Sequence, residues 1–184
     1  MLIGPKAHKG RRLLVVLGAM AFTLGATSQS CTLRELLKKD SNSDLSFSTS
    51  LRILDSGGAE LDTFNQGDPI EFELKVRNRD NQSATVTFPT SQQTDFVVVK
   101  AGTDTVVWQW SKHQVAPTQT SSTLDFAADQ TRTFRVDWDQ TDDNGNLLDR
   151  GNYEARGVMV FDGFDNDPLK VNQFGSDPEP FTVQ

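Results

Sequence analysis

Few side chains in this sequence are of the types that carry out catalysis, and the first candidate is a single histidine. His113 is the only histidine after residue 30, and it lies in a Ser-Lys-His segment predicted to be a loop. A Ser-His-Asp triad cannot be derived from one histidine without geometry. No second histidine or nearby cysteine is placed to share a zinc ion with it. We therefore predict a protein that is not an enzyme, with no catalytic residue and no cofactor, and retain His113 as a candidate ligand-binding residue.

Crowded carboxylates are the second group that could bind a ligand. One cluster surrounds Asn144-Gly145, and another follows a later predicted strand. Their hard oxygen atoms are ligands that Ca²⁺ prefers, but neither cluster has EF-hand spacing. A solvated hairpin loop on an acidic protein is the favoured interpretation. The weak metal candidates are Asp139, Asp142 and Asp143, beside Asp137 in the first cluster, and the second cluster is Asp162, Asp165 and Asp167.

Tryptophans form the third group. Trp108 and Trp110 are two residues apart in a predicted strand, so they would share one face of it. Facing inward they would belong to the core, and facing outward they would form an aromatic platform for a sugar ring or a partner side chain. The polar Gln109 between them favours the inward orientation, most clearly for Trp108. Trp110, beside a loop, stays open between core and ligand binding, and Trp138 is predicted to be core.

Cys31 is the only cysteine, and it follows a segment laid out like an export signal. Basic residues come first, then an apolar run over residues 13–26, then small polar residues. The 14 apolar residues fall short of the roughly 20 that span a bilayer. A cysteine at the cleavage point is typical of bacterial lipoproteins. We predict a signal peptide over residues 1–30 and lipid attachment at Cys31.

An alternative remains for this N-terminal segment. Ser28 stands where such lipoproteins usually have leucine, and Gln29 is bulky for the next place. The general signal peptidase could instead cleave after Ser28 or Ser30, leaving one unpaired thiol on an exported protein. Lipid attachment at Cys31 would place the chain in the cell envelope, anchored to a bacterial membrane. Thr32 after the cysteine favours the outer membrane in a Gram-negative host. Cleavage by the general signal peptidase would instead make the chain secreted or periplasmic.

Charge narrows the range of partners. The whole chain carries 18 basic and 25 acidic side chains, and four of the basic ones precede residue 31, which leaves 14 against 25 and a net charge of −11. An acidic surface repels phosphate backbones, so we predict no nucleic-acid partner. It also disfavours binding to anionic lipids through a basic patch, which leaves the lipid anchor as the membrane contact.

Residues 31–44 are predicted to be a tether, and the pattern changes to short alternating runs from residue 45 onward. The clearest alternation of apolar and charged side chains lies at residues 70–77. Strands every 8–15 residues, with no helical period, predict an all-β antiparallel sandwich over residues 45–184. The predicted strands lie near residues 45–53, 70–77, 84–88, 96–99, 106–110, 134–138, 153–161 and 180–183.

One detail identifies the kind of sandwich. Gly151 lies two residues before Tyr153, the only tyrosine, at the start of a predicted strand. This is how the tyrosine corner of immunoglobulin-like sandwiches appears, in which the hydroxyl bonds to nearby upstream backbone. The fold class predicted from the residues is therefore an immunoglobulin-like antiparallel β-sandwich.

Five segments, in this order and spacing, resemble the BsuPI domain, which is named for an intracellular proteinase inhibitor of Bacillus. The most specific are the strand that ends at Asn78, the Gln-x-x-Asp-Phe run from Gln92 to Phe96, and the Trp-x-Trp segment. The resemblance covers roughly residues 63–161. It implies an immunoglobulin-like sandwich and, for its namesake, inhibition of a serine proteinase. It implies no reactive-site residue.

Together these features predict a non-catalytic cell-envelope lipoprotein whose immunoglobulin-like domain binds another protein. Contacts would come from exposed strand edges or from the loops at residues 111–123 and 139–149. Proteinase inhibition is a special case of this prediction and makes a proteinase the partner. The alternatives are a carbohydrate-binding module that uses Trp110 and neighbouring polar residues, and a structural envelope protein.

Overall fold

The structure, a computed structural model, describes residues 45–161, 169 and 174–184. Several predictions from the sequence lie outside these residues: the signal peptide, lipid attachment at Cys31, the tether, and the acidic cluster of Asp162, Asp165 and Asp167. Within the described residues, no helix has the length and apolar character needed to cross a bilayer.

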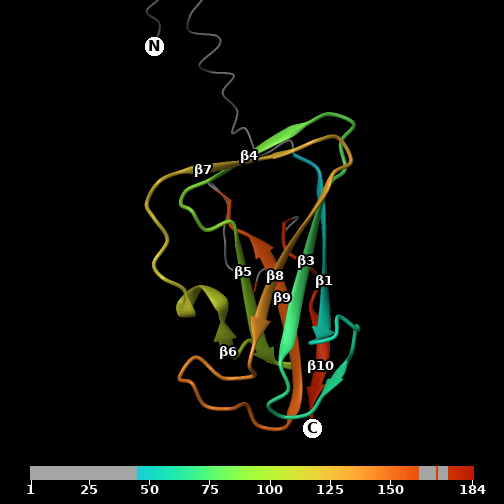
Figure 1. The fold of residues 1–184 in the computed structure, drawn as a ribbon, viewed down its shortest axis with the longest axis vertical. Helices are drawn as coiled ribbons and strands as arrows, with labels where there is room; N and C mark the ends of the chain where they lie inside the picture. The colour runs from blue at the N-terminus through green and yellow to red at the C-terminus, as the bar shows by residue number, and fades with distance from the viewer. Residues whose placement is uncertain (1–44, 162–168, 170–173) are drawn as a thin grey trace, which may run out of the picture. The chain divides into compact units, whose positions relative to one another are not determined.

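A three-stranded antiparallel sheet forms one layer of the fold (Figure 1). Its strands are β1 (Phe47–Asp55), β3 (Ile70–Asn78) and β8 (Thr131–Trp138), with β3 in the centre. Successive side chains of a strand point to opposite faces, so apolar residues at every second position lie together on the buried face. Phe72 in β3 pairs with Ile53 on one side and Val136 on the other, and all three are at least partly buried.

A five-stranded sheet forms the second layer. It contains β2 (Thr63–Phe64), β10 (Glu179–Val183), β9 (Gly151–Met159), β5 (Thr94–Lys100) and β6 (Val106–Gln109), in that order. All neighbours are antiparallel except β2 and β10. A separate ribbon pairs β4 (Ala84–Phe88) with β7 (Ser122–Phe126), at the top of Figure 1. One 3₁₀ helix, η1 (Trp110–His113), follows β6.

The core lies between the two sheets and is rich in aromatic side chains. Phe72 of β3 is stacked on Phe96 of β5, with ring centroids 6.4 Å apart. Trp138 of β8 meets Phe181 of β10 edge to face at 6.1 Å. These contacts join strands of opposite sheets, which defines a sandwich. The orders β1-β3-β8 and β10-β9-β5 correspond to strands A-B-E and G-F-C of the immunoglobulin fold, so the predicted fold class is confirmed.

The tyrosine corner is confirmed as well. The Tyr153 hydroxyl donates a hydrogen bond of 2.7 Å to the carbonyl oxygen of Asp149, four residues upstream. Gly151 adopts a φ of 158°, at the edge of extended backbone, as β9 begins. Burial raises the pKa of Tyr153 above its ordinary value, so the hydroxyl stays protonated and able to donate. The loop before β9 is thereby held against the strand that follows it.

Two expectations about strand boundaries need correction. The strand predicted to include Trp110 ends at Gln109, and Trp110 instead opens η1, because Asp95 draws the chain away from the sheet through the hydrogen bonds described below. Strand β7 begins at Ser122, inside the loop predicted over residues 111–123. Its sequence, Ser-Thr-Leu-Asp-Phe, is mostly polar, and its pairing with β4 gives it strand structure.

Candidate functional site

Asp95 is a buried carboxylate in β5, directly before the apolar run of residues 96–99. It is 4% exposed, and it accepts four hydrogen bonds. Oδ1 takes the backbone N–H groups of Phe96, at 2.9 Å, and Ser111, at 3.0 Å. Oδ2 takes Gln109 Nε2 at 2.6 Å and Ser111 Oγ at 2.8 Å. The bonds to Gln109 and Ser111 lie at the point where β6 ends and η1 begins, so Asp95 holds the start of η1 against β5.

Asp143 joins the two loops that the sequence singled out. It belongs to the loop at residues 139–149, and its Oδ2 accepts a hydrogen bond of 2.5 Å from Lys112 Nζ in η1. Oδ1 accepts the Gln109 backbone N–H at 2.9 Å and lies 3.1 Å from His113 Nε2. The Asp143 backbone N–H donates to the carbonyl oxygen of Val107 at 2.9 Å. We call these contacts the Asp143 clasp.

The clasp also covers the open side of β6, the edge strand of the larger sheet. Both the N–H of Gln109 and the carbonyl of Val107 bond to Asp143 rather than pointing free into solvent. An edge whose backbone groups are already bonded cannot readily pair with an added strand. One edge of the other sheet is β8, whose exposed side chains include the charged Arg135 and Asp137. Charged residues on an edge strand disfavour pairing with another chain.

Burial alone would raise the pKa of Asp143, but hydrogen bonds from Lys112, the Gln109 backbone and His113 outweigh it and hold the pKa below its usual value. The carboxylate thus stays ionised at neutral pH, where it can bind the Lys112 ammonium. Two other carboxylates of this loop behave similarly. The Thr141 hydroxyl lowers the pKa of Asp139, and the Asn146 backbone N–H lowers that of Asp142.

Acidification is expected to open the Asp143 clasp, and Asp143→Asn isolates the effect. Because the pKa of Asp143 is lower in the folded than in the unfolded chain, its carboxylate stabilises the fold above its ordinary pKa of 3.8. This contribution is lost as the pH falls through the lowered folded value. Urea unfolding at pH 7 should show the wild type more stable than Asp143→Asn by about 1 kcal/mol. The difference should vanish in strong acid, and a difference independent of pH would contradict the assignment.

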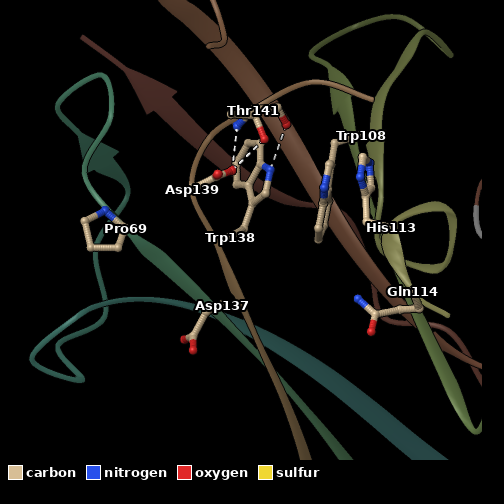
Figure 2. Close-up of a pocket in the computed structure, with 8 residues that line it drawn as sticks. All are labelled: Pro69, Trp108, His113, Gln114, Asp137, Trp138, Asp139 and Thr141. Atoms are coloured by element: carbon tan, nitrogen blue, oxygen red, sulfur yellow. Dashed lines mark hydrogen bonds between the residues drawn. The ribbon is translucent and has the colours of Figure 1, made fainter. Parts of the chain in front are cut away.

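A cleft of about 370 Å³ opens beside the clasp, between η1 and the end of β8 (Figure 2). Trp108 and His113 line it, with their rings stacked at 6.2 Å and 17°. Trp138 lines it too, with its ring centroid 5.3 Å from that of Trp108, and its Nε1 donates a hydrogen bond of 3.0 Å to the Thr141 carbonyl oxygen. Both tryptophans are at most 4% exposed, so their prediction as core residues is confirmed. The His113 ring covers part of the indole that a sugar would need for stacking.

Trp110 has a different position from Trp108. It is half-buried, and its ring meets Phe96 edge to face at 6.3 Å and 83°. Because β6 ends before it, Trp110 does not share a strand face with Trp108. Its role in ligand binding, like that of His113, stays a prediction.

The three aspartates considered as metal candidates have separate partners. Asp139 accepts from the Thr141 hydroxyl at 2.6 Å, and Asp142 accepts the backbone N–H groups of Asn144 and Asn146 at 2.9 and 2.8 Å. Asp143 forms the clasp. In the part of the chain that the structure describes, no three acidic, histidine or cysteine side chains are grouped so that they could hold a metal ion.

The most exposed apolar side chain of the site was missed by the sequence reasoning. Val115 is 93% exposed, in the segment of residues 114–117 that leaves η1 towards β7 at the left of Figure 1. Gln114 has extended backbone, with φ −95° and ψ 155°. Past the segment, the backbone N–H of Thr118 donates to Ser91 Oγ at 3.0 Å, and that of Ser91 to the Thr118 carbonyl at 3.2 Å. One signal could have revealed it: a lone valine among uncharged loop residues, two positions before a proline.

The fold and the site define an immunoglobulin-like β-sandwich that presents an apolar loop segment supported at both ends. Residues 58–163 match the BsuPI family, described as intracellular proteinase inhibitor. The match spans more than half of the sequence, and the chain belongs to this family. The resemblance predicted over residues 63–161 is thereby confirmed. No curated protein matches the chain.

Solved structures give weaker similarities. A β-glucosidase from Erythrobacter marinus is 10% identical, with a TM-score of 0.43 over 76% of this chain and 16% of its own. A CARDB domain from Pyrococcus furiosus, solved with di-metal ions, is 13% identical, with a TM-score of 0.40 over 76% of this chain and 93% of its own. The DNA glycosylase AlkC from Pseudomonas fluorescens, bound to DNA, is 7% identical, with a TM-score of 0.41 over 76% of this chain and 30% of its own.

Proposed function

We propose that this protein is a non-catalytic inhibitor that binds a proteinase through the loop segment at residues 114–117. The family supplies the class of partner, because its description is that of a proteinase inhibitor. The observation that carries the proposal is the exposure of this segment between two fixed points. Asp95 holds the chain before it through Ser111, and Ser91 holds the chain after it through Thr118.

Such support matters because binding orders flexible groups at a cost in free energy. A segment already held in its bound conformation loses less conformational entropy on association. Protease–inhibitor complexes are of the preorganised kind, in which the interface backbone moves little between free and bound structures. Loop insertion is favoured over pairing with β6 or β8, since the Asp143 clasp covers the edge of β6 and β8 carries charged side chains.

Inhibition assays with the purified full chain test this function. A fixed amount of each of several serine proteinases is titrated with the chain, and residual cleavage of a small chromogenic substrate is measured. We expect a saturable loss of activity that is complete near one chain per enzyme molecule. The chain should remain uncleaved and should be recoverable as a complex by size-exclusion chromatography. Full activity of every proteinase at a large excess of the chain would refute the proposal.

We further propose that Cys31 carries a lipid that anchors the chain at the cell envelope. The support is the sequence pattern alone, with its basic residues, short apolar run and lone cysteine. Cys31→Ser should move the protein from the membrane fraction to the soluble fraction of cells. An unchanged distribution would contradict lipid anchoring without bearing on inhibition.

A further inference from the structure

We propose that Val115 is the specificity residue of this inhibitor, and that its partner is a serine proteinase whose S1 pocket accepts small aliphatic side chains. This inference rests on the proposed function and adds the partner's pocket chemistry. Residues 114–117 would occupy the active site as a substrate does, with the Val115 side chain in the S1 pocket. No covalent bond is formed or broken, and inhibition is reversible occupation of the cleft.

Exposure singles out Val115. Among the described residues three large hydrophobic side chains are exposed, Leu61 at 42%, Leu147 at 49% and Val115 at 93%. The chain itself therefore buries roughly half of the surface of Leu61 and Leu147, whereas the surface of Val115 is almost entirely exposed to solvent. Burying apolar surface is favourable, so an apolar side chain projected this far can gain most by entering a partner's pocket.

The backbone around Val115 is suited to a proteinase active site. Proteinases bind the chain on either side of the scissile bond in an extended form, and such recognition uses main-chain hydrogen bonds plus pockets for side chains. Gln114 is extended. Pro117 has a fixed φ, and it biases Ala116 before it towards extended conformations. Neither Val115 nor Ala116 has a positive φ. The extended Gln114 and the restraint that Pro117 places on Ala116 both favour the extended shape of a bound substrate.

Charge excludes the most obvious alternative, a trypsin-like partner. The nearest lysine or arginine in the sequence is Lys112, which lies in η1 and is paired with Asp143. Inserting it into an acidic S1 pocket would break the clasp and unwind the 3₁₀ turn. From residue 114 to residue 124 the sequence contains no charged side chain. Recognition by this segment therefore relies on shape and apolar contact, which fits a small, uncharged S1 pocket such as that of elastase.

A change of specificity tests the inference with the full chain. Inhibition constants are measured against elastase, trypsin and chymotrypsin for the wild type, Val115→Lys, Val115→Asp and Leu61→Lys. Leu61→Lys is the matched control, because it places the same charge at an exposed apolar residue outside the segment. We expect the wild type to inhibit elastase most strongly. Val115→Lys should lose about 100-fold of that inhibition and gain inhibition of trypsin. Val115→Asp should lose it without a gain, and Leu61→Lys should stay within about twofold.

The outcomes separate the inference from the proposed function. If the wild type inhibits none of the proteinases, the proposed function itself has failed. If it inhibits one of them but the two Val115 variants inhibit that enzyme equally well, inhibition stands and this inference is overturned. Preferential inhibition of trypsin by the wild type would overturn it too. Equal melting temperatures of all four chains would show that the variants fold, as expected for side chains with this exposure.

Discussion

Replacing Phe72 with alanine is expected to lower the free energy of unfolding by about 4 kcal/mol. Phe72 is 1% exposed, and its ring lies within 6.4 Å of four other aromatic rings. These rings come from four different strands of the two sheets: Phe96, Trp108, Trp138 and Phe181. Removing the ring would leave a cavity at the point where the sheets meet, because the surrounding strands cannot all move to fill it. The effect should be among the largest for a single substitution.

Urea unfolding monitored by tryptophan fluorescence measures the loss, since Trp108 and Trp138 flank the cavity. Phe72→Leu is the matched variant, because it keeps an apolar side chain of similar volume and should cost about 1.5 kcal/mol. Leu61→Ala, at an exposed residue, should change the unfolding free energy by less than about 0.5 kcal/mol. A Phe72→Ala variant as stable as Leu61→Ala would show that Phe72 is not central to the core.

The strands at the centre of the sandwich could be predicted because burial imposes a period of two on them. Residues 70–77 alternate apolar and charged side chains, and they form the central strand β3. The run at residues 96–99 is apolar on both faces, and it lies in β5 in the middle of the larger sheet. Tyr153 was recognisable because the tyrosine corner needs a short-range bond only. Such features depend on local pattern, so the sequence alone reveals them.

The site was less predictable, because its geometry depends on contacts between residues far apart in the sequence. The sequence singled out both end loops, but it could not show that Asp143 would bond to Lys112 across 31 residues. Asp95 and Asn78 were noticed only as parts of a family resemblance. The structure gives each a role: Asp95 bonds to Ser111, and Asn78 Nδ2 donates to the carbonyl oxygens of Gln82 and Ala127. Both are buried polar residues whose partners lie on other segments.

The 3₁₀ helix and the exposed valine were missed for the same reason. Alternation at Val106, Trp108 and Trp110 continued the strand pattern, and nothing local indicated that a buried carboxylate would end it at Gln109. The position of Val115 then depends on where that strand stops. The bonds from Gln109 and Ser111 to a single buried carboxylate thus lie where the strand ends, just before the exposed segment.

Asp95→Ala is expected to release η1 and the N-terminal side of the loop segment from the sandwich. The substitution removes the acceptor of four hydrogen bonds and leaves donors of Ser111 and Gln109 without it. Unpaired buried donors keep their full desolvation cost, so the free energy of unfolding should fall by about 3 kcal/mol. Hydrogen exchange should be faster at the Ser111 amide, which donates to Asp95, than at the Thr118 amide, which donates to Ser91. The amides of β3 should exchange only through global unfolding, at the rate that the lowered stability sets. Inhibition should weaken with the loss of preorganisation.

Asp95→Asn provides the matched control, because it keeps the shape and one acceptor oxygen. That oxygen can still accept the Phe96 and Ser111 N–H groups, so the cost should be about 1 kcal/mol. The rank order wild type, Asn, Ala should then hold for stability, for slow exchange at Ser111 and for inhibition alike. Asp95 is buried and does not contact the proteinase, so it acts as a positioning residue. If Asp95→Ala left exchange at Ser111 unchanged, this carboxylate would not hold the start of the loop segment, and the support there would have to come from the Asp143 clasp.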